Sequence, residues 1–160
     1  MDKNNLIGDE ILFNPKPDAV PYSYRISYKL AQICLILDMC CGRSGASLLK
    51  IHMISVGLST IEDMKLLKEF AFGEQSNYTV VRLDPAVNHA VRYALAEELL
   101  IQQKNGLFRL LKRGKIYSKK IKDNQLLGKE IEYLSILSTN LSEDKIKTLT
   151  SFWRYSSAEN

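Results

Sequence analysis

The sequence of 160 residues has no long apolar run, few cysteines and only two histidines. No stretch approaches the roughly 20 apolar residues of a membrane-spanning helix, and the first five residues lead into no apolar segment of a secretory signal. We therefore expect a cytoplasmic protein that does not associate with membranes. The three cysteines, Cys34, Cys40 and Cys41, are odd in number and lie in an apolar segment. This placement favours free buried thiols over a disulfide framework.

The residue patterns that usually carry catalysis are also missing. His52 lies in an apolar segment, which predicts a hydrogen-bonded core histidine, and His89 lies among polar residues, which predicts a surface position. The cysteines lack the paired spacing of a zinc site. The stretch Gly42-Arg43-Ser44-Gly45 lacks the Gly-Lys-Ser/Thr ending of a phosphate-binding loop. The sequence thus predicts no catalytic residues, no metal and no cofactor, and the protein is not expected to be an enzyme.

A composition of 46% apolar and 25% charged residues indicates one compact domain with appendages. Apolar periodicity and capping residues predict mostly helical structure. The expected helices cover residues 22–41, 46–58, a segment starting after Ser59 or Thr60, 85–99, 114–121, a segment through 127–137, and 142–155. Short strands are expected at residues 10–13 and 78–83, where the second is rich in β-branched side chains.

The dipeptide Asn105-Gly106 is the strongest turn signal in the chain, because both residues tolerate the positive φ of a type I′ turn. It predicts a hairpin with strands over residues 100–104 and 107–111. Alternation along the second strand places Phe108 and Leu110 toward the core and Arg109 toward solvent.

The hairpin begins a strongly basic segment, because residues 101–122 contain eight lysines and arginines and no acidic residue. Such a segment is either a solvated face that protects a strand edge or a surface for phosphates or an acidic partner. Eight cations without a counter-charge exceed what edge protection needs, which favours the second interpretation. The candidate residues for binding DNA phosphates are Lys104, Arg109, Lys112, Arg113, Lys115, Lys119 and Lys120.

A second candidate surface lies near the end of the chain, where the last expected helix carries Phe152, Trp153 and Tyr155. A terminal helix seldom keeps a tryptophan unless it docks on its own core or on a partner. We predict that these three aromatic residues bind a partner protein.

The order of helix, strand, helix and basic hairpin predicts a winged helix-turn-helix-like domain over residues 22–122. An arm over residues 1–21 precedes it, and a helical extension over residues 123–160 follows it. The expected fold class is therefore mainly α with a small β part.

Three tracts resemble a known family: NPKPD at 14–18, YRISYKLAQICLILDMCCG at 24–42 and ASLLKIHMISVGL at 46–58. They are similar to the small middle component of bacterial three-component ABC systems, the group that contains the Lamassu-type anti-phage complexes. The resemblance implies an accessory subunit that accompanies an SMC-like ABC ATPase and an effector that is often a nuclease. It attributes no catalytic residue to this subunit.

Two functions follow as expectations. In the first, a non-catalytic subunit docks on the ATPase and couples sensing of double-stranded DNA to the effector nuclease in antiviral defence. In the second, the chain is a self-standing winged-helix transcriptional regulator, which would read bases through the start of its recognition helix. That start leaves Asn88 as the only base reader, with Arg92 offered toward the groove. This sparse set favours the accessory subunit.

Overall fold

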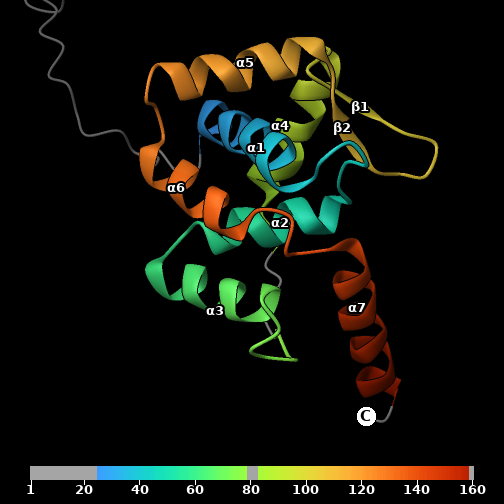
Figure 1. Cartoon of the computed structure of the whole chain (residues 1–160). Helices are drawn as coiled ribbons and strands as arrows, with labels where there is room; N and C mark the ends of the chain where they lie inside the picture. Colours follow the sequence, from blue (N-terminus) through green and yellow to red (C-terminus); the bar gives the residue numbers. More distant parts are fainter. Residues whose placement is uncertain (1–24, 79–82, 159–160) are drawn as a thin grey trace, which may run out of the picture.

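The computed structural model describes residues 25–78 and 83–158, and for residues 155–158 it describes the backbone alone. The described residues form helices and one two-stranded antiparallel sheet (Figure 1), which confirms the mainly helical prediction with a small β part. In chain order the elements are α1 (Ile26–Cys40), α2 (Leu48–Gly57), α3 (Ile61–Ala71), α4 (Pro85–Ala96), β1 (Leu100–Gln102), β2 (Phe108–Leu110), α5 (Lys112–Asp123), α6 (Gly128–Leu137) and α7 (Glu143–Ala158). The predicted arm over residues 1–21, the strand at 10–13 and most of the strand at 78–83 lie outside the described residues.

Helix α1 is the centre of the structure. Helices α2, α4, α5 and α6 all pack against it, and they surround it in Figure 1. All six residues from Gln32 to Leu37 are buried, and together they go more than once around the helix, so no side of this part of the helix faces solvent. A helix that is apolar all round belongs in the core, as its wide apolar stripe predicts.

Capping residues set the starts of two helices as predicted. The side chain of Thr60 accepts a hydrogen bond from the backbone N–H of Asp63 at the start of α3. The side chain of Asp84 accepts one from the N–H of Ala86, and Pro85 is the first residue of α4. Both arrangements satisfy N–H groups that have no partner within the helix.

Several predicted helix boundaries are wrong, and three of them have a clear local reason. Helix α2 begins at Leu48 because Ser47 caps it and Ala46 pairs with a strand. Helix α4 ends at Ala96 because Glu98 takes a left-handed conformation (φ 55°) and the chain then enters β1. Helix α5 begins at Lys112, so the expected turn before residue 114 is already helical.

The hairpin is present with Leu100, Ile101 and Gln102 opposite Leu110, Arg109 and Phe108. Phe108 and Leu110 are buried and Arg109 is exposed, as alternation predicts.

The predicted type I′ turn is wrong. The N–H of Gly106 donates to the carbonyl of Gln103 (2.9 Å), and Gly106 (φ 84°) has positive φ whereas Asn105 does not. The connection is a three-residue loop that ends in a left-handed glycine, a second common use of Asn-Gly.

A third segment joins the hairpin from a distant part of the sequence. Ala46 pairs with Phe108 through two backbone hydrogen bonds of 2.9 and 2.7 Å. Gly45 makes this approach possible, because a Cβ atom at its position (φ 82°) would lie 2.2 Å from the carbonyl oxygen of Phe108. The connection between α1 and α2 therefore fixes the position of the hairpin.

The predicted C-terminal extension shares the core of the rest of the chain. Leu134, Leu137 and Leu141 are fully buried in the same apolar cluster as α1, and the hydroxyl of Tyr133 donates to the carbonyl of Met64 (2.8 Å). Helix α7 then runs away from the other helices in Figure 1, with its start near α2.

The three cysteines are free and buried, as predicted. Burial raises the pKa of Cys34 to about 12, with a smaller contribution from the carboxylate of Asp38. Burial is also the main cause that raises the pKa of Cys40 to about 12 and that of Cys41 to about 11.

These raised pKa values predict that stability decreases at alkaline pH. The folded state holds the thiol protons more tightly than the unfolded state, in which the ordinary pKa is 9.0. The thiols therefore stabilise the fold fully below pH 9, and this contribution is lost as the pH rises from there toward about 12. Urea unfolding at increasing pH should show a falling midpoint, with a shallower fall for Cys34→Ala. Equal pH dependence in the parent and the variant would contradict this prediction.

Candidate nucleic-acid interface

Helix α5 has one small inner side and a cationic outer side. Its buried residues Gly114, Ser118 and Ile121 face the body of the protein. The spacing of these residues leaves most of the other positions of the helix to solvent. Five exposed cations occupy those positions: Lys112, Arg113, Lys115, Lys119 and Lys120.

Close contacts hold α5 against the body. A Cβ atom at Gly114 would lie 2.3 Å from the carbonyl oxygen of Leu99, so only glycine permits this approach. One carboxylate oxygen of Asp38 on α1 accepts from the hydroxyl of Ser118 (2.8 Å) and from the ammonium of Lys122 (2.6 Å). Lys122 is thereby paired within the protein.

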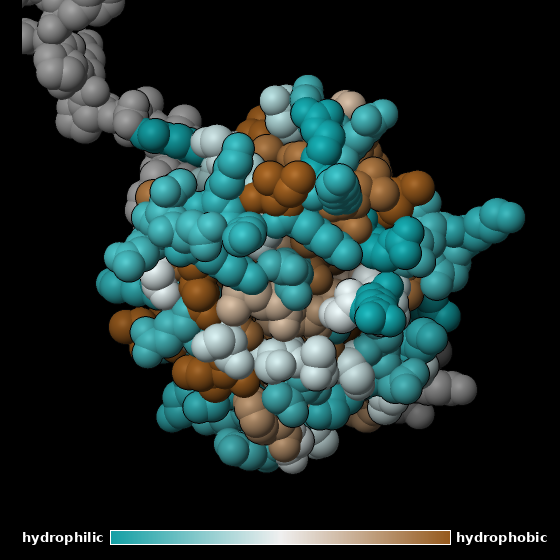
Figure 2. All heavy atoms as spheres, turned by 45° about the horizontal axis from the view of Figure 1, so that its top comes forward, coloured by the Kyte–Doolittle hydropathy of each residue, from teal (hydrophilic) through white to brown (hydrophobic). Residues whose placement is uncertain are grey.

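The hairpin adds two cations, because Arg109 lies on the exposed side of β2 and Lys104 lies in the exposed loop. All seven predicted phosphate-binding residues are thus exposed, and we call the set of seven the cationic face. Figure 2 turns the α5 side of the molecule forward and shows hydrophilic side chains over it, with hydrophobic ones between them. Of the seven, Arg113 lies 3.9 Å from Glu97, and both side chains are about half exposed. An exposed pair of this kind contributes little energy and does not prevent Arg113 from binding an anion.

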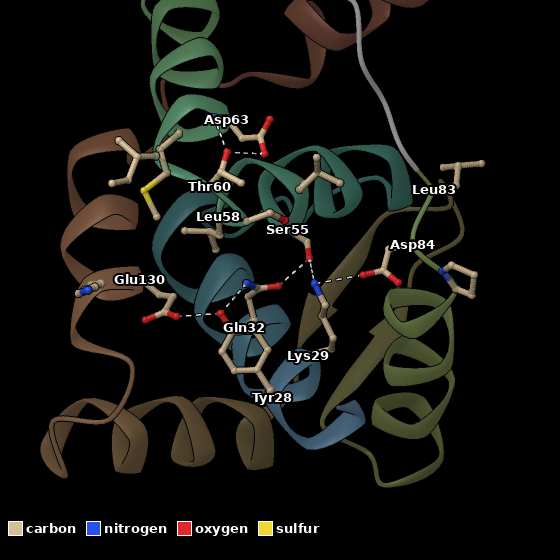
Figure 3. Close-up of a pocket in the computed structure, with 16 residues that line it drawn as sticks. Tyr28, Lys29, Gln32, Ser55, Leu58, Thr60, Asp63, Leu83, Asp84 and Glu130 are labelled. Atoms are coloured by element: carbon tan, nitrogen blue, oxygen red, sulfur yellow. Dashed lines mark hydrogen bonds and ion pairs between the residues drawn. The ribbon is translucent and has the colours of Figure 1, made fainter. Parts of the chain in front are cut away.

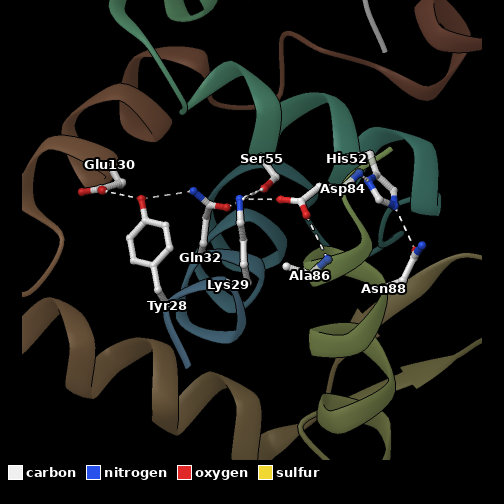
Figure 4. Close-up of polar contacts among 9 residues, drawn as sticks. All are labelled: Tyr28, Lys29, Gln32, His52, Ser55, Asp84, Ala86, Asn88 and Glu130. Carbon is white, nitrogen blue, oxygen red and sulfur yellow. Dashed lines mark hydrogen bonds and ion pairs between the residues drawn. The ribbon is translucent and has the colours of Figure 1, made fainter. Parts of the chain in front are cut away.

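His52 is a core residue, as predicted. Only 1% of it is exposed, its Nδ1 accepts the backbone N–H of Asp84 (3.3 Å), and its Nε2 lies 3.0 Å from the side-chain oxygen of Asn88. Figure 4 shows that Asn88 points toward this ring. The one base reader expected for a regulator is therefore half-buried and contacts a core histidine. His89 is exposed, also as predicted.

A polar network that the sequence analysis did not identify lies between α1, α2, α4 and α6 (Figure 4). The ammonium of Lys29 donates to the hydroxyl of Ser55 (3.0 Å) and pairs with Asp84 (3.2 Å). Ser55 in turn donates to the side-chain oxygen of Gln32 (2.6 Å). The network continues through Tyr28, whose hydroxyl donates to Glu130 (2.7 Å).

This network lines one wall of a pocket of about 620 Å³ (Figure 3). Lys29, Gln32 and Ser55 are nearly inaccessible, and each polar atom that they bury has a hydrogen-bond partner. Their polar groups hold helices together rather than await a ligand. A weak signal was present in the sequence, since Lys29 and Gln32 are polar residues in a helix that is mainly apolar.

The terminal aromatic residues have different environments. Phe152 is 56% exposed and borders a second pocket, of about 630 Å³, between α7 and the segment that follows α3. Trp153 is half-buried and packs against the core. The side chain of Tyr155 lies outside the described residues.

Each helix within residues 25–78 and 83–158 is too short or too polar to cross a membrane. Within the same residues, no group of three or more His, Cys, Asp or Glu side chains is placed to hold a metal ion.

Together these features define a small, mainly helical protein with a cationic face built on α5 and the hairpin. Comparison with models of protein families, with curated proteins and with solved structures gives no match.

Proposed function

We propose that this protein is a non-catalytic accessory subunit that binds the phosphate backbone of double-stranded DNA. In this proposal it docks on an SMC-like ABC ATPase and couples DNA binding to an effector nuclease in antiviral defence. The observation that carries the DNA part is the cationic face, seven exposed cations within a segment that contains no acidic residue. Phosphates attract such a surface through charge, independently of base sequence. The ATPase and the effector come from the family resemblance, which covers roughly residues 14–121 and is carried by the three tracts within residues 14–58.

A winged-helix-like arrangement is part of this proposal. The pairing of Ala46 with Phe108 supports it. This pairing places a short strand-like segment between α1 and α2 and joins it to the hairpin that follows α4. In this interpretation the hairpin is the wing, α4 corresponds to the recognition helix, and α3 is an insertion between α2 and α4.

The placement of Asn88 favours binding to the backbone over reading of bases. A regulator reads bases through the first turns of its recognition helix. In α4 those turns offer Asn88, whose side-chain oxygen lies beside His52. The experiment is titration of the full chain with duplexes of unrelated sequence at increasing salt. Affinity should be equal for all duplexes and should fall steeply with salt; a strong preference for one sequence would favour the regulator.

Docking on the ATPase is expected to involve Phe152. Phe152→Ala should change the free energy of unfolding by less than about 0.5 kcal/mol, because its side chain is largely exposed. It should nevertheless reduce recovery of the ATPase in affinity purification from the native host. Trp153→Ala is the matched variant and should destabilise the fold by about 1 to 2 kcal/mol, because Trp153 packs against the core. Unchanged recovery of the ATPase with Phe152→Ala would exclude this dock.

A further inference from the structure

Two tyrosines lie on α4 and α5, on the same side of the protein as the ion pair between Glu97 and Arg113 of the cationic face. Tyr93 on α4 is 50% exposed, and Tyr117 on α5 is half-buried. Glu97 lies one turn after Tyr93 and Arg113 lies one turn before Tyr117, and the two side chains form an exposed ion pair of 3.9 Å. Burial raises the pKa of Tyr117, and the Cys34 thiol and the Tyr93 hydroxyl raise it further, as expected for neighbouring groups.

The apolar surface continues from Tyr117 into a pocket of about 470 Å³ at the end of α5. Tyr117, Ala31 and Leu127 contribute apolar surface to it, and Lys120 of the cationic face lines it too. The loop beside it holds both Gln125 (φ 52°) and Leu127 (φ 57°) in the left-handed region. A bulky residue seldom adopts this conformation, and such residues gather at binding sites.

Tyr93, Tyr117 and the adjoining pocket form what we call the tyrosine strip. The charge and shape of the tyrosine strip indicate what it binds. Its flanking cations call for an anion, and its tyrosines and pocket call for flat apolar groups next to each negative charge. A nucleic-acid strand has both, with one phosphate and one base in every nucleotide. A blunt duplex keeps the faces of its bases stacked inside, whereas a single strand exposes them. An acidic peptide has the charge but lacks a flat ring at each repeat.

We propose that Tyr93, Tyr117 and the adjoining pocket bind a single-stranded segment of DNA, whose bases stack on the tyrosines while its phosphates contact Arg113 and Lys120. This inference rests on the proposed function, because it assigns an unpaired strand to the same cationic face that contacts the duplex. The cations of that face contact phosphates, and the two tyrosines beside Lys120 add a surface on which exposed bases stack.

The test compares oligothymidylate with a blunt duplex of the same length, using the full chain. Tyr93→Leu should weaken binding of oligothymidylate about tenfold, the order expected when one base loses its aromatic platform. Tyr93→Phe is the matched control and should bind like the parent, because it keeps the ring. Both variants should bind the blunt duplex like the parent and should melt at its temperature, since Tyr93 is half exposed.

A second measurement detects the stacking of a base directly. A fluorescent purine analogue placed in the oligothymidylate should lose emission when it stacks on the parent protein, and should keep more of it with Tyr93→Leu. Equal affinity of Tyr93→Leu and Tyr93→Phe for oligothymidylate would overturn the inference. Tighter binding of an oligoglutamate peptide with the same dependence on Tyr93 would also overturn it, in favour of an acidic protein segment. If the affinity for the blunt duplex stays unchanged when cations of the cationic face are replaced, the proposed function itself is refuted.

Discussion

Replacing Arg109 and Arg113 together with glutamate should sharply reduce the salt dependence of DNA binding. The slope of log affinity against log salt should become shallower by about 1.8, because each phosphate contact contributes about 0.9. Both side chains are exposed, and the only ion pair of Arg113 in the described structure is the distant one with Glu97. The fold should therefore survive, with a melting temperature close to that of the parent.

Lys65→Glu with Lys68→Glu is the matched control for this charge reversal. It changes the net charge by the same amount on α3, which lies on the other side of the molecule from α5 in Figure 1. Its slope should be reduced far less than that of the Arg109 and Arg113 variant. If the arginine variant instead fails to assemble with the ATPase and its DNA slope is unchanged, the cations pair with acidic residues of a protein partner.

Lys29→Met should destabilise the fold by about 3 kcal/mol. The Lys29 side chain is 5% exposed and that of Asp84 17%, so the substitution leaves a largely buried carboxylate without its counter-charge. It also removes the donor to Ser55 and interrupts the network that joins α1 to α2. Urea unfolding followed by circular dichroism measures the loss, with an unchanged m-value if only stability has changed.

The double variant Lys29→Met with Asp84→Ser separates the two causes of this loss. Serine keeps an oxygen that caps α4 but carries no charge, so most of the stability should return. If the double variant is as unstable as Lys29→Met alone, the loss arises from packing around Lys29 and not from an unpaired charge.

Local signals in the sequence predicted the elements whose causes are local. Thr60 and Asp84 cap their helices because each side chain reaches an N–H two or three residues away. The turn type at Asn105-Gly106 depends on the register between two strands, and register is set by distant packing. The pairing of Ala46 with Phe108 was equally invisible, because it joins residues far apart in the chain and a single pair has no periodicity.

The candidate site divides in the same way. The cationic face was predictable, because a basic segment without acids and the alternation in β2 both show in the sequence. The neighbouring tyrosines were not, because Tyr93 and Tyr117 belong to helices that only the hairpin and the central helix bring together. The Lys29 network was missed for a related reason, since its residues look like interruptions of an apolar helix until their partners are known.

The two sides of α5 make different demands on the sequence. On the inner side, a larger residue at Gly114 would clash with the backbone of Leu99. A residue without a hydroxyl at Ser118 would leave Asp38 without one of its hydrogen bonds. Within residues 25–78 and 83–158, the side chains of the five outer cations form no hydrogen bond or ion pair apart from the weak pair at Arg113. Selection can therefore raise or lower the affinity of this helix for an anionic partner, one charge at a time, without destabilising the folded state.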